Sequence, residues 1–160
     1  VAGRAGERVQ SAALLAGAAA TAAGLSVTMR TDSPVTQGTG FSLAELTFAP
    51  EPIAYTGLVD PDVVVVTAAE GAGELLGRGL LAPGAARRWV MDASLPVPEG
   101  LAPVERDLRA RYGAKAAALG ALVEEIDRAG WWDRRAWSVA IAQLPVSRRS
   151  AAEAVLAKAR

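Results

Sequence analysis

Four consecutive valines at residues 63–66 constrain the fold of this chain more than any other feature. Valine is β-branched and favours strands, and Asp60, Pro61 and Asp62 form a turn signal directly before the run. A strand with one face in solvent would alternate apolar and polar residues, whereas a continuous apolar run suits a strand that is covered on both faces. The run therefore predicts a sheet with helices on both sides.

The rest of the chain alternates between strand and helix patterns. Strands are expected at 25–29, 41–48, 53–55 and 88–91, and helices at 7–23, 70–78, 115–128, 134–143 and 147–158. Gly24 is placed to end the first helix and Ser147 to cap the last, while residues 32–40 have loop composition. The order predicts one α/β domain over residues 1–160. It is expected to be a three-layer α/β/α domain with a mixed, mostly parallel sheet and a helical part from about residue 104.

The chain contains no histidine and no cysteine, which narrows its chemistry. These absences exclude Cys-ligated iron–sulfur clusters, His/Cys zinc sites, disulfides, thiol nucleophiles and Ser-His-Asp triads. The 17 Lys and Arg residues balance 17 Asp and Glu residues, so no basic field is present to hold a nucleic acid. Carboxylates, arginines, hydroxyls and backbone amides remain as functional groups.

The apolar stretch at residues 11–25 follows Arg4 and Arg8 and has the pattern of a secretory signal. We favour the alternative of an alanine-rich buried helix, and the stretch is too short to span a bilayer. No membrane partner is expected, and the expected location is the cytoplasm.

Small side chains dominate the candidate core. Alanine occupies 36 of the 160 positions, and only 5% of the residues are aromatic. Small apolar side chains bury little area each, so the sequence predicts a thin core that gains stability from a partner surface.

Two glycines near the start indicate a backbone cradle for an anion. Gly3 and Gly6 lie between the end of a strand and the start of a helix, where free N–H groups and the helix dipole attract anions. Arg4 and Arg8 flank this loop and are candidates to contact phosphates of coenzyme A or a nucleotide; the alternative is an interface or solvated role. Glu7 adds a like charge beside any phosphate. Arg8 occupies the place of the third glycine in a GxGxxG fingerprint.

Four blocks of the chain, in order, resemble the gamma subunit or gamma domain of 2-oxoacid:acceptor oxidoreductases. The first is Gly3-Arg4-Ala5-Gly6-Glu7-Arg8-Val9 with the Ala/Leu-rich helix after it, where the family has Gly-x-Gly-Gly-Gln-Gly-Val. The second is Gly38-Thr39-Gly40 before an alternating strand and Pro52-Ile53. The third is Pro61-Asp62 before the valines, and the fourth is Leu119-Gly120-Ala121-Leu122. The scaffold residues are kept, and the departures (Ala5, Glu7, Arg8, Gly38 and Thr39) fall at ligand-facing positions.

The resemblance implies a division of labour. Thiamine diphosphate and magnesium sit between alpha and beta subunits, 4Fe-4S clusters sit in a ferredoxin-like subunit, and the gamma part packs beside them. In members that use coenzyme A (CoA), the gamma part helps to hold it. The family oxidises a 2-oxoacid with CoA to acyl-CoA, carbon dioxide and a reduced acceptor.

Carried onto this chain, the resemblance implies no catalytic residue and no metal ligand. It implies cofactor-binding positions at Gly3, Arg4, Gly6 and Arg8, and a subunit interface at Thr36, Gln37, Gly38, Thr39 and Gly40. Two alternatives stay open: a free-standing nucleotide-binding module, and a purely structural subunit.

Three other groups invite a functional interpretation. Arg30 and Asp32 end the second expected strand, where a nucleotide-binding sheet can hold a ribose or its 2′-phosphate. Trp131, Trp132 and Trp137 could form a stacking platform, but we favour Trp132 or Trp137 filling a helix junction, with another of the indoles at a subunit contact. The acidic pairs Glu124-Glu125 and Glu105/Asp107 are expected on solvated faces.

Overall fold

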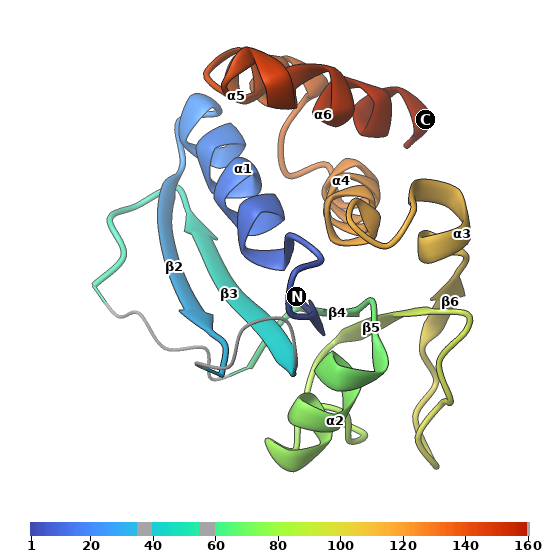
Figure 1. The fold of residues 1–160 in the computed structure, drawn as a ribbon. Coiled ribbons are helices and arrows are strands. Elements are labelled where there is room, and N and C mark those ends of the chain that lie inside the picture. The colour runs from blue at the N-terminus through green and yellow to red at the C-terminus, as the bar shows by residue number, and fades with distance from the viewer. Residues whose placement is uncertain (35–39, 55–59, 160) are drawn as a thin grey trace.

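The computed structural model describes residues 1–34, 40–54 and 60–159 of the chain. Within these residues, six strands form one sheet and six helices pack around it (Figure 1). The strands are β1 (Ala2–Arg4), β2 (Ser26–Asp32), β3 (Phe41–Ala49), β4 (Val63–Val66), β5 (Arg88–Asp92) and β6 (Val104–Arg106). The helices are α1 (Val9–Ala22), α2 (Ala69–Gly77), α3 (Leu108–Tyr112), α4 (Ala117–Ala129), α5 (Arg134–Ala142) and α6 (Val146–Lys158).

The sheet is mixed and mostly parallel, as the sequence predicts. Its strand order is β2-β3-β1-β4-β5-β6. The pairs β1–β4, β4–β5 and β5–β6 are parallel, whereas β3 pairs antiparallel with both β1 and β2. Among the described strands, β3 alone therefore runs against the others, and it separates β2 from β1.

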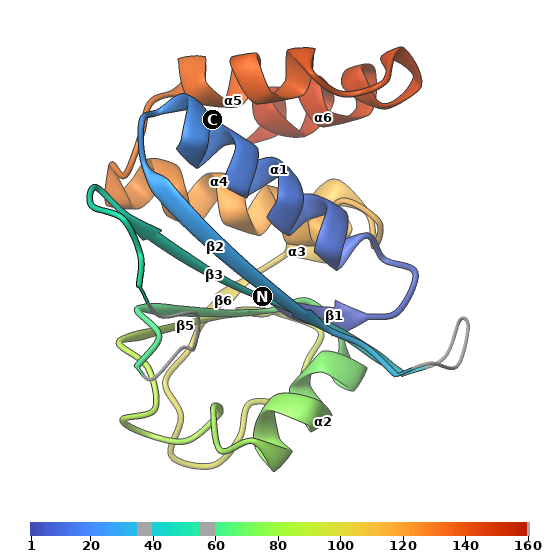
Figure 2. The ribbon, with the colours of Figure 1, turned by 90° about the vertical axis from the view of Figure 1, so that its left-hand side faces the viewer.

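Helices cover both faces of the sheet (Figure 2). α1 packs on β2 and β3 and α4 contacts β4 on one face, while α2 packs on β1 and β3 on the other. α5 and α6 pack on α1 and α4 and add an outer helical layer (Figure 1). The three-layer α/β/α prediction is confirmed, with the C-terminal helices stacked on one of its outer layers.

The valine run forms β4 in the middle of the sheet, between β1 and β5. Val64 and Val66 pack with Leu75 of α2 on one face, and Val65 packs with Leu108 and residues of α4 on the other. Both faces of the strand are thus buried, which explains why the run contains no polar residue.

Alanines let α1 approach its neighbours closely. Ala12, Ala13, Ala16, Ala19 and Ala20 are all buried along α1. The helix ends as predicted at Gly24, whose φ of +85° lets the Leu25 N–H donate to the Ala20 carbonyl at 3.0 Å in a Schellman motif.

Two tryptophans supply the volume that the alanines lack. Trp137 is fully buried, and Trp132 meets Phe48 of β3 edge-on, with ring centroids 5.0 Å apart. Both lie in the same core cluster as Ala16, Ala19 and Ala20. The helix-junction role predicted for the tryptophans is therefore confirmed for these two, while Trp131 stays 41% exposed.

The C-terminal part departs from the predicted elements in two places. β6 and α3 occupy residues 104–112, where a continuous helical pattern was expected. β6 has three residues and pairs with β5 from Val90↔Val104 to Asp92↔Arg106, so tertiary pairing decides its conformation. Ser147 lies inside α6, whose N-cap is Pro145 without a side-chain cap, so the predicted Ser147 cap is wrong.

The N-terminal half differs from the predicted elements at two smaller points. Ile53 and Ala54 are not in a strand, and Tyr55 lies outside the described residues. Pro50 and Pro52 lie just before this stretch, and neither has the N–H donor that a strand ladder needs. β2 also extends to Asp32, which was placed in the following loop.

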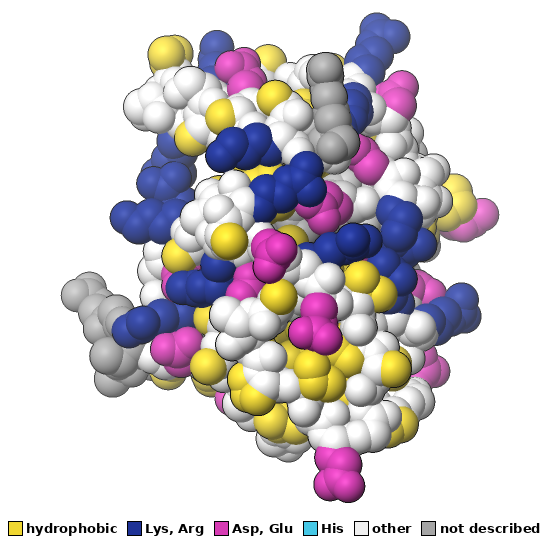
Figure 3. All heavy atoms as spheres, turned by 90° about the vertical axis from the view of Figure 1, so that its right-hand side faces the viewer, with side chains coloured by type: hydrophobic (Ala, Val, Ile, Leu, Met, Phe, Trp, Pro, Cys, Tyr) yellow, Lys and Arg dark blue, Asp and Glu magenta, His cyan; other side chains and the backbone are white. Residues whose placement is uncertain are grey.

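Charge is interspersed on the face that Figure 3 shows. Lys and Arg side chains lie there among Asp and Glu, and hydrophobic side chains gather toward the end of the molecule that carries α2 in Figure 1. This face has no uniform basic field, in line with the balanced composition. No helix in the described ranges is long and apolar enough to cross a membrane.

Candidate functional site

The candidate site lies where β1 and β4 run side by side and their following helices diverge. α1 follows β1 on one face of the sheet, and α2 follows β4 on the opposite face (Figures 1 and 2). In open α/β sheets, ligands bind in the crevice that such a reversal opens at the carboxyl ends of the strands. The predicted glycine loop connects β1 to α1 at this point.

The two loop glycines are required by the backbone. A Cβ on Gly3 would lie 2.4 Å from Thr67 Oγ1 and 2.9 Å from a Val9 methyl carbon. Gly6 has a φ of +85°, which side chains rarely allow. The two glycines therefore serve the packing and the turn, whatever the loop binds.

A third glycine, which the sequence did not single out, lets α2 rest on β1. A Cβ on Gly71 would lie 2.5 Å from the backbone nitrogen of Gly3 and 2.7 Å from the carbonyl carbon of Ala2. The approach of α2 is thus a backbone-to-backbone contact directly beneath the loop.

Arg8 takes a conformation that favours glycine. Its φ of 60° and ψ of 26° are left-handed, and it is the one non-glycine residue with positive φ in the described part of the chain. The family pattern has glycine at this position. The Arg8 side chain is exposed, and it makes no capping hydrogen bond to α1.

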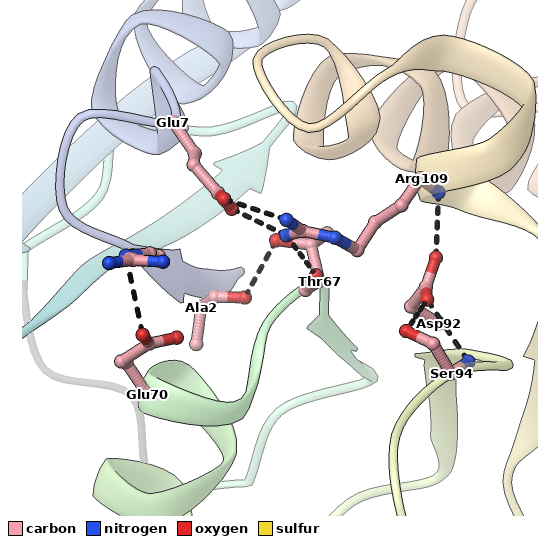
Figure 4. A network of polar contacts seen from close by, with 8 residues as sticks. Ala2, Glu7, Thr67, Glu70, Asp92, Ser94 and Arg109 are labelled. Carbon is pink, nitrogen blue, oxygen red and sulfur yellow. Dashed lines mark hydrogen bonds and ion pairs between the residues drawn. The ribbon is translucent and has the colours of Figure 1, made fainter.

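The acidic residue of the loop points inward and is neutralised within the chain (Figure 4). Glu7 is 8% exposed, and both its oxygens accept from Arg109, at 2.8 and 2.9 Å. Arg109 also donates to the Thr67 carbonyl at 3.0 Å, and its hydrogen bonds to Glu7 raise the pKa of its guanidinium. A bidentate pair thus links the loop that precedes α1 to α3.

Asp92 at the end of β5 completes the network. It is 2% exposed, and it accepts from the Arg109 backbone N–H at 2.6 Å and from the Ser94 N–H and hydroxyl. Asp92 therefore caps α3, whose own N-cap residue Asp107 makes no side-chain cap. On the α2 side, Arg4 pairs with Glu70 at 3.3 Å on the surface.

The four residues predicted to bind a cofactor thus differ in their contacts and in their exposure to solvent. Gly3 and Gly6 shape the loop, Arg4 pairs with Glu70, and Arg8 extends into solvent. Thr67, Asp92 and Arg109 were missed. The ends of the valine strand and of residues 88–91 gave a signal for Thr67 and Asp92, because carboxyl ends of parallel strands share an edge. Arg109 lies 102 residues from Glu7 and gave none.

The described residues can neutralise one another here but offer little to a new anion. Glu7 places a carboxylate beside the loop, and the Arg109 guanidinium is already bonded to both of its oxygens. No group of three or more metal-ligating side chains occurs in residues 1–34, 40–54 and 60–159. Of the predicted interface loop, Thr36, Gln37, Gly38 and Thr39 lie outside the described residues. Gly40 accepts from the Ala5 N–H at 2.9 Å.

The strand order counts against dinucleotide binding by Arg30 and Asp32. In a dinucleotide-binding sheet the second strand lies beside the first, whereas here β3 separates β2 from β1. Asp32 is also engaged by Arg78, which closes α2.

A hollow of about 760 Å³ lies near the amino ends of β4 and β5, away from the glycine loop. Its three arginines are bonded to carboxylates that also line it: Arg87 to Asp62, and Arg88 and Arg128 to Glu125. Glu125 accepts from Arg88 at 2.8 and 3.2 Å and from Arg128 at 2.9 Å. Glu125 is buried, so the expectation of a solvated face is wrong for this residue: the two guanidinium groups offset the loss of its hydration. Glu124 accepts from the Tyr112 hydroxyl at 2.6 Å.

Comparisons with known proteins give a match in structure and none in sequence. No family model matches the chain, and no curated protein matches it. The gamma subunit of a keto/oxoacid ferredoxin oxidoreductase from Geobacter sulfurreducens has a similar structure. The TM-score is 0.73 at 14% identity, over 99% of this chain and 90% of that one.

Two further solved structures have a similar fold. A pyruvate oxidoreductase subunit from Thermotoga maritima matches with a TM-score of 0.67 at 18% identity, over 99% and 91% of the two chains. A 2-oxoglutarate:ferredoxin oxidoreductase from Magnetococcus marinus, with 2-oxoglutarate, coenzyme A and succinyl-CoA bound, matches with a TM-score of 0.75 at 16% identity. That match covers 99% of this chain and 29% of the longer one. The chain therefore shares its fold with gamma subunits of 2-oxoacid ferredoxin oxidoreductases, as the sequence resemblance predicted.

Proposed function

We propose that this chain is a non-catalytic gamma subunit of a thiamine-diphosphate, iron–sulfur 2-oxoacid:acceptor oxidoreductase complex in the cytoplasm. Its partners are alpha and beta subunits that hold thiamine diphosphate and magnesium, and a ferredoxin-like subunit that holds 4Fe-4S clusters. The complex converts a 2-oxoacid and CoA to acyl-CoA, carbon dioxide and reduced acceptor. This chain contributes contact surface to the other subunits of the complex.

The observation that carries the proposal is the match to a separate gamma subunit over nearly the full length of both chains. The composition supports the same role, because a chain without histidine or cysteine has few groups for proton transfer and none for ligating a cluster. Affinity purification of the tagged native chain tests it. We expect larger subunits to co-purify with thiamine diphosphate and iron. Purification as a chain without partners would favour the free-standing module.

We further propose that the glycine loop is structural and does not hold CoA. The bidentate Glu7–Arg109 pair supports this, because both Glu7 oxygens already engage the Arg109 guanidinium, which is then not free to bind a phosphate. The exposed Arg8 supports the competing proposal, in which Gly3, Arg4, Gly6 and Arg8 contact the coenzyme.

Steady-state kinetics of the assembled enzyme separate the two proposals. An Arg–phosphate hydrogen bond contributes about 1.5–3 kcal/mol, so its loss in Arg8→Ala would raise KM for CoA by roughly ten- to a hundredfold with little change in kcat. We expect KM to stay unchanged. A rise of that size would assign the loop to CoA.

The interface role of residues 36–40 is part of the same proposal. Gly40 lies beside the glycine loop, since its carbonyl accepts from the Ala5 N–H. Hydrogen exchange of residues 36–40 should slow when the chain assembles with its partners. Equal exchange in the free and the assembled chain would place the loop outside the interface.

A further inference from the structure

A hollow of about 270 Å³ lies between α1, α4 and α6, on the helical side of the sheet. Its floor is aliphatic and includes Leu15 of α1, Leu119 of α4 and Val155 of α6. We call it the three-helix groove. It is separate from the Glu7–Arg109 network, whose acceptor and donor atoms belong to neither its floor nor its rim.

Three cations surround this aliphatic floor. Arg8 comes from the start of α1, Lys115 directly precedes α4, and Arg148 belongs to the first turn of α6. All three are exposed, and none forms an ion pair with a described residue. No described residue that lines the groove is acidic.

Eight arginines of the described chain meet carboxylates, as Arg88 meets Glu125 and Arg134 meets Asp127. Other described arginines without an ion pair, such as Arg30 and Arg135, do not line this groove. Around the groove, three positive charges from three elements converge without a counter-charge, and the N-terminal ends of the helices add to the positive potential. A surface that fits this groove must therefore bring negative charge to the three cations and an apolar side chain to the aliphatic floor.

We propose that the three-helix groove receives a segment of a partner subunit, in which an aliphatic side chain is flanked by carboxylates. The aliphatic side chain fills the hollow, and the carboxylates meet Arg8, Lys115 and Arg148. A protein segment suits the groove better than a free small anion. The hollow is slightly smaller than ordinary ligand pockets, and its exposed cations bind strongly only when a covering surface excludes water.

The inference rests on the proposed function, because it needs a complex. The groove proposal can be tested by cross-linking at lysine, because the chain has two lysines, Lys115 and Lys158, and only Lys115 lines the groove. A water-soluble carbodiimide joins a lysine amine to a carboxylate in contact with it. Applied to the purified native complex and read by mass spectrometry, it should link Lys115 to an Asp or Glu of a larger subunit. Lys158, which donates to the Arg111 carbonyl at the far end of α6, is the internal control.

Variants supply the second readout. Lys115→Arg keeps the charge and should assemble normally while losing the cross-link. Lys115→Glu combined with Arg148→Glu should weaken association at least tenfold, and added salt should then restore part of it by screening the new repulsion between carboxylates. Arg135→Glu is the matched control, because Arg135 is an exposed α5 cation outside the groove, and it should change association less than threefold.

Each other outcome overturns a different statement. If the complex forms but Lys115 stays unlinked and reacts with an amine reagent as fast as in the free chain, the groove proposal fails while the proposed function stands. A link from Lys115 to a second copy of this chain would make the groove a self-association site. An anionic amphiphile found by native mass spectrometry with Lys115 still reactive would make it a ligand pocket. Absence of any larger subunit would remove the proposed function itself.

Discussion

At the scale of single residues, Arg8 has the most unusual backbone in the glycine loop. A left-handed conformation costs a side-chain-bearing residue about 1–2 kcal/mol, and glycine escapes that cost. Glycine also gains about 0.4–1 kcal/mol of unfolded-state entropy, which partly offsets the benefit. Arg8→Gly should therefore raise the free energy of unfolding by up to about 1 kcal/mol, as measured by urea denaturation.

Gly6→Ala is the matched control for Arg8→Gly. It places a side chain at a φ of +85° in the same loop, with no atom within 4 Å of the new Cβ, so it changes backbone strain without a clash. It should lower stability by about 1 kcal/mol. Effects of the same sign in both variants would contradict the conformational argument.

The Glu7–Arg109 pair should be one of the strongest polar contributions to stability. Removing one partner of a largely buried charge pair leaves the other without compensation, and Arg109 here is partly accessible to water. We expect Glu7→Gln to cost about 2–3 kcal/mol. A double-mutant cycle with Arg109→Gln measures the coupling directly. A coupling energy below about 0.5 kcal/mol would show that the pair does not hold the glycine loop to α3.

At the scale of elements, α2 offers a comparison within one helix. Gly71→Ala would force a Cβ to 2.5 Å from the Gly3 backbone nitrogen, so α2 must move away from β1. The clash involves backbone atoms, and we expect a loss of about 2–3 kcal/mol. Gly73→Ala meets nothing within 4 Å and should gain about 0.5–1 kcal/mol from helix propensity. Equal urea midpoints for the two variants would contradict the close contact between α2 and β1.

The elements also show how far sequence patterns reach. The valine run and the helical period at 115–128 follow from local composition, so β4 and α4 could be predicted. β6 is three residues long with no alternation of its own, and its conformation comes from pairing with β5. The Glu7–Arg109 pair joins residues 102 positions apart, so the loop was predictable and its internal neutralisation was not.

At the scale of the whole molecule, large hydrophobic side chains remain on the surface. Among the described residues they include Leu14, Leu76 and Val146, the last of them 77% exposed. Covering these side chains with a partner surface would stabilise the chain, which fits the proposed role as a subunit with an alanine-rich core.

The stability of the isolated chain should therefore fall well below that of the assembled one. Partners at a thousand times their dissociation constant add about 4 kcal/mol to the free energy of unfolding. For a chain of this length, each kcal/mol raises Tm by about 2–4 °C, so assembly should raise Tm by about 10 °C. Calorimetry of the free chain and of the complex measures the difference, and the free chain should also aggregate on heating. Dilution of the complex below its dissociation constant is the control, because it should return Tm to the value of the free chain. If the free chain melts at as high a temperature as the complex, the alanine-rich core is sufficient for stability by itself. A partner would then add no stability by covering the exposed hydrophobic residues.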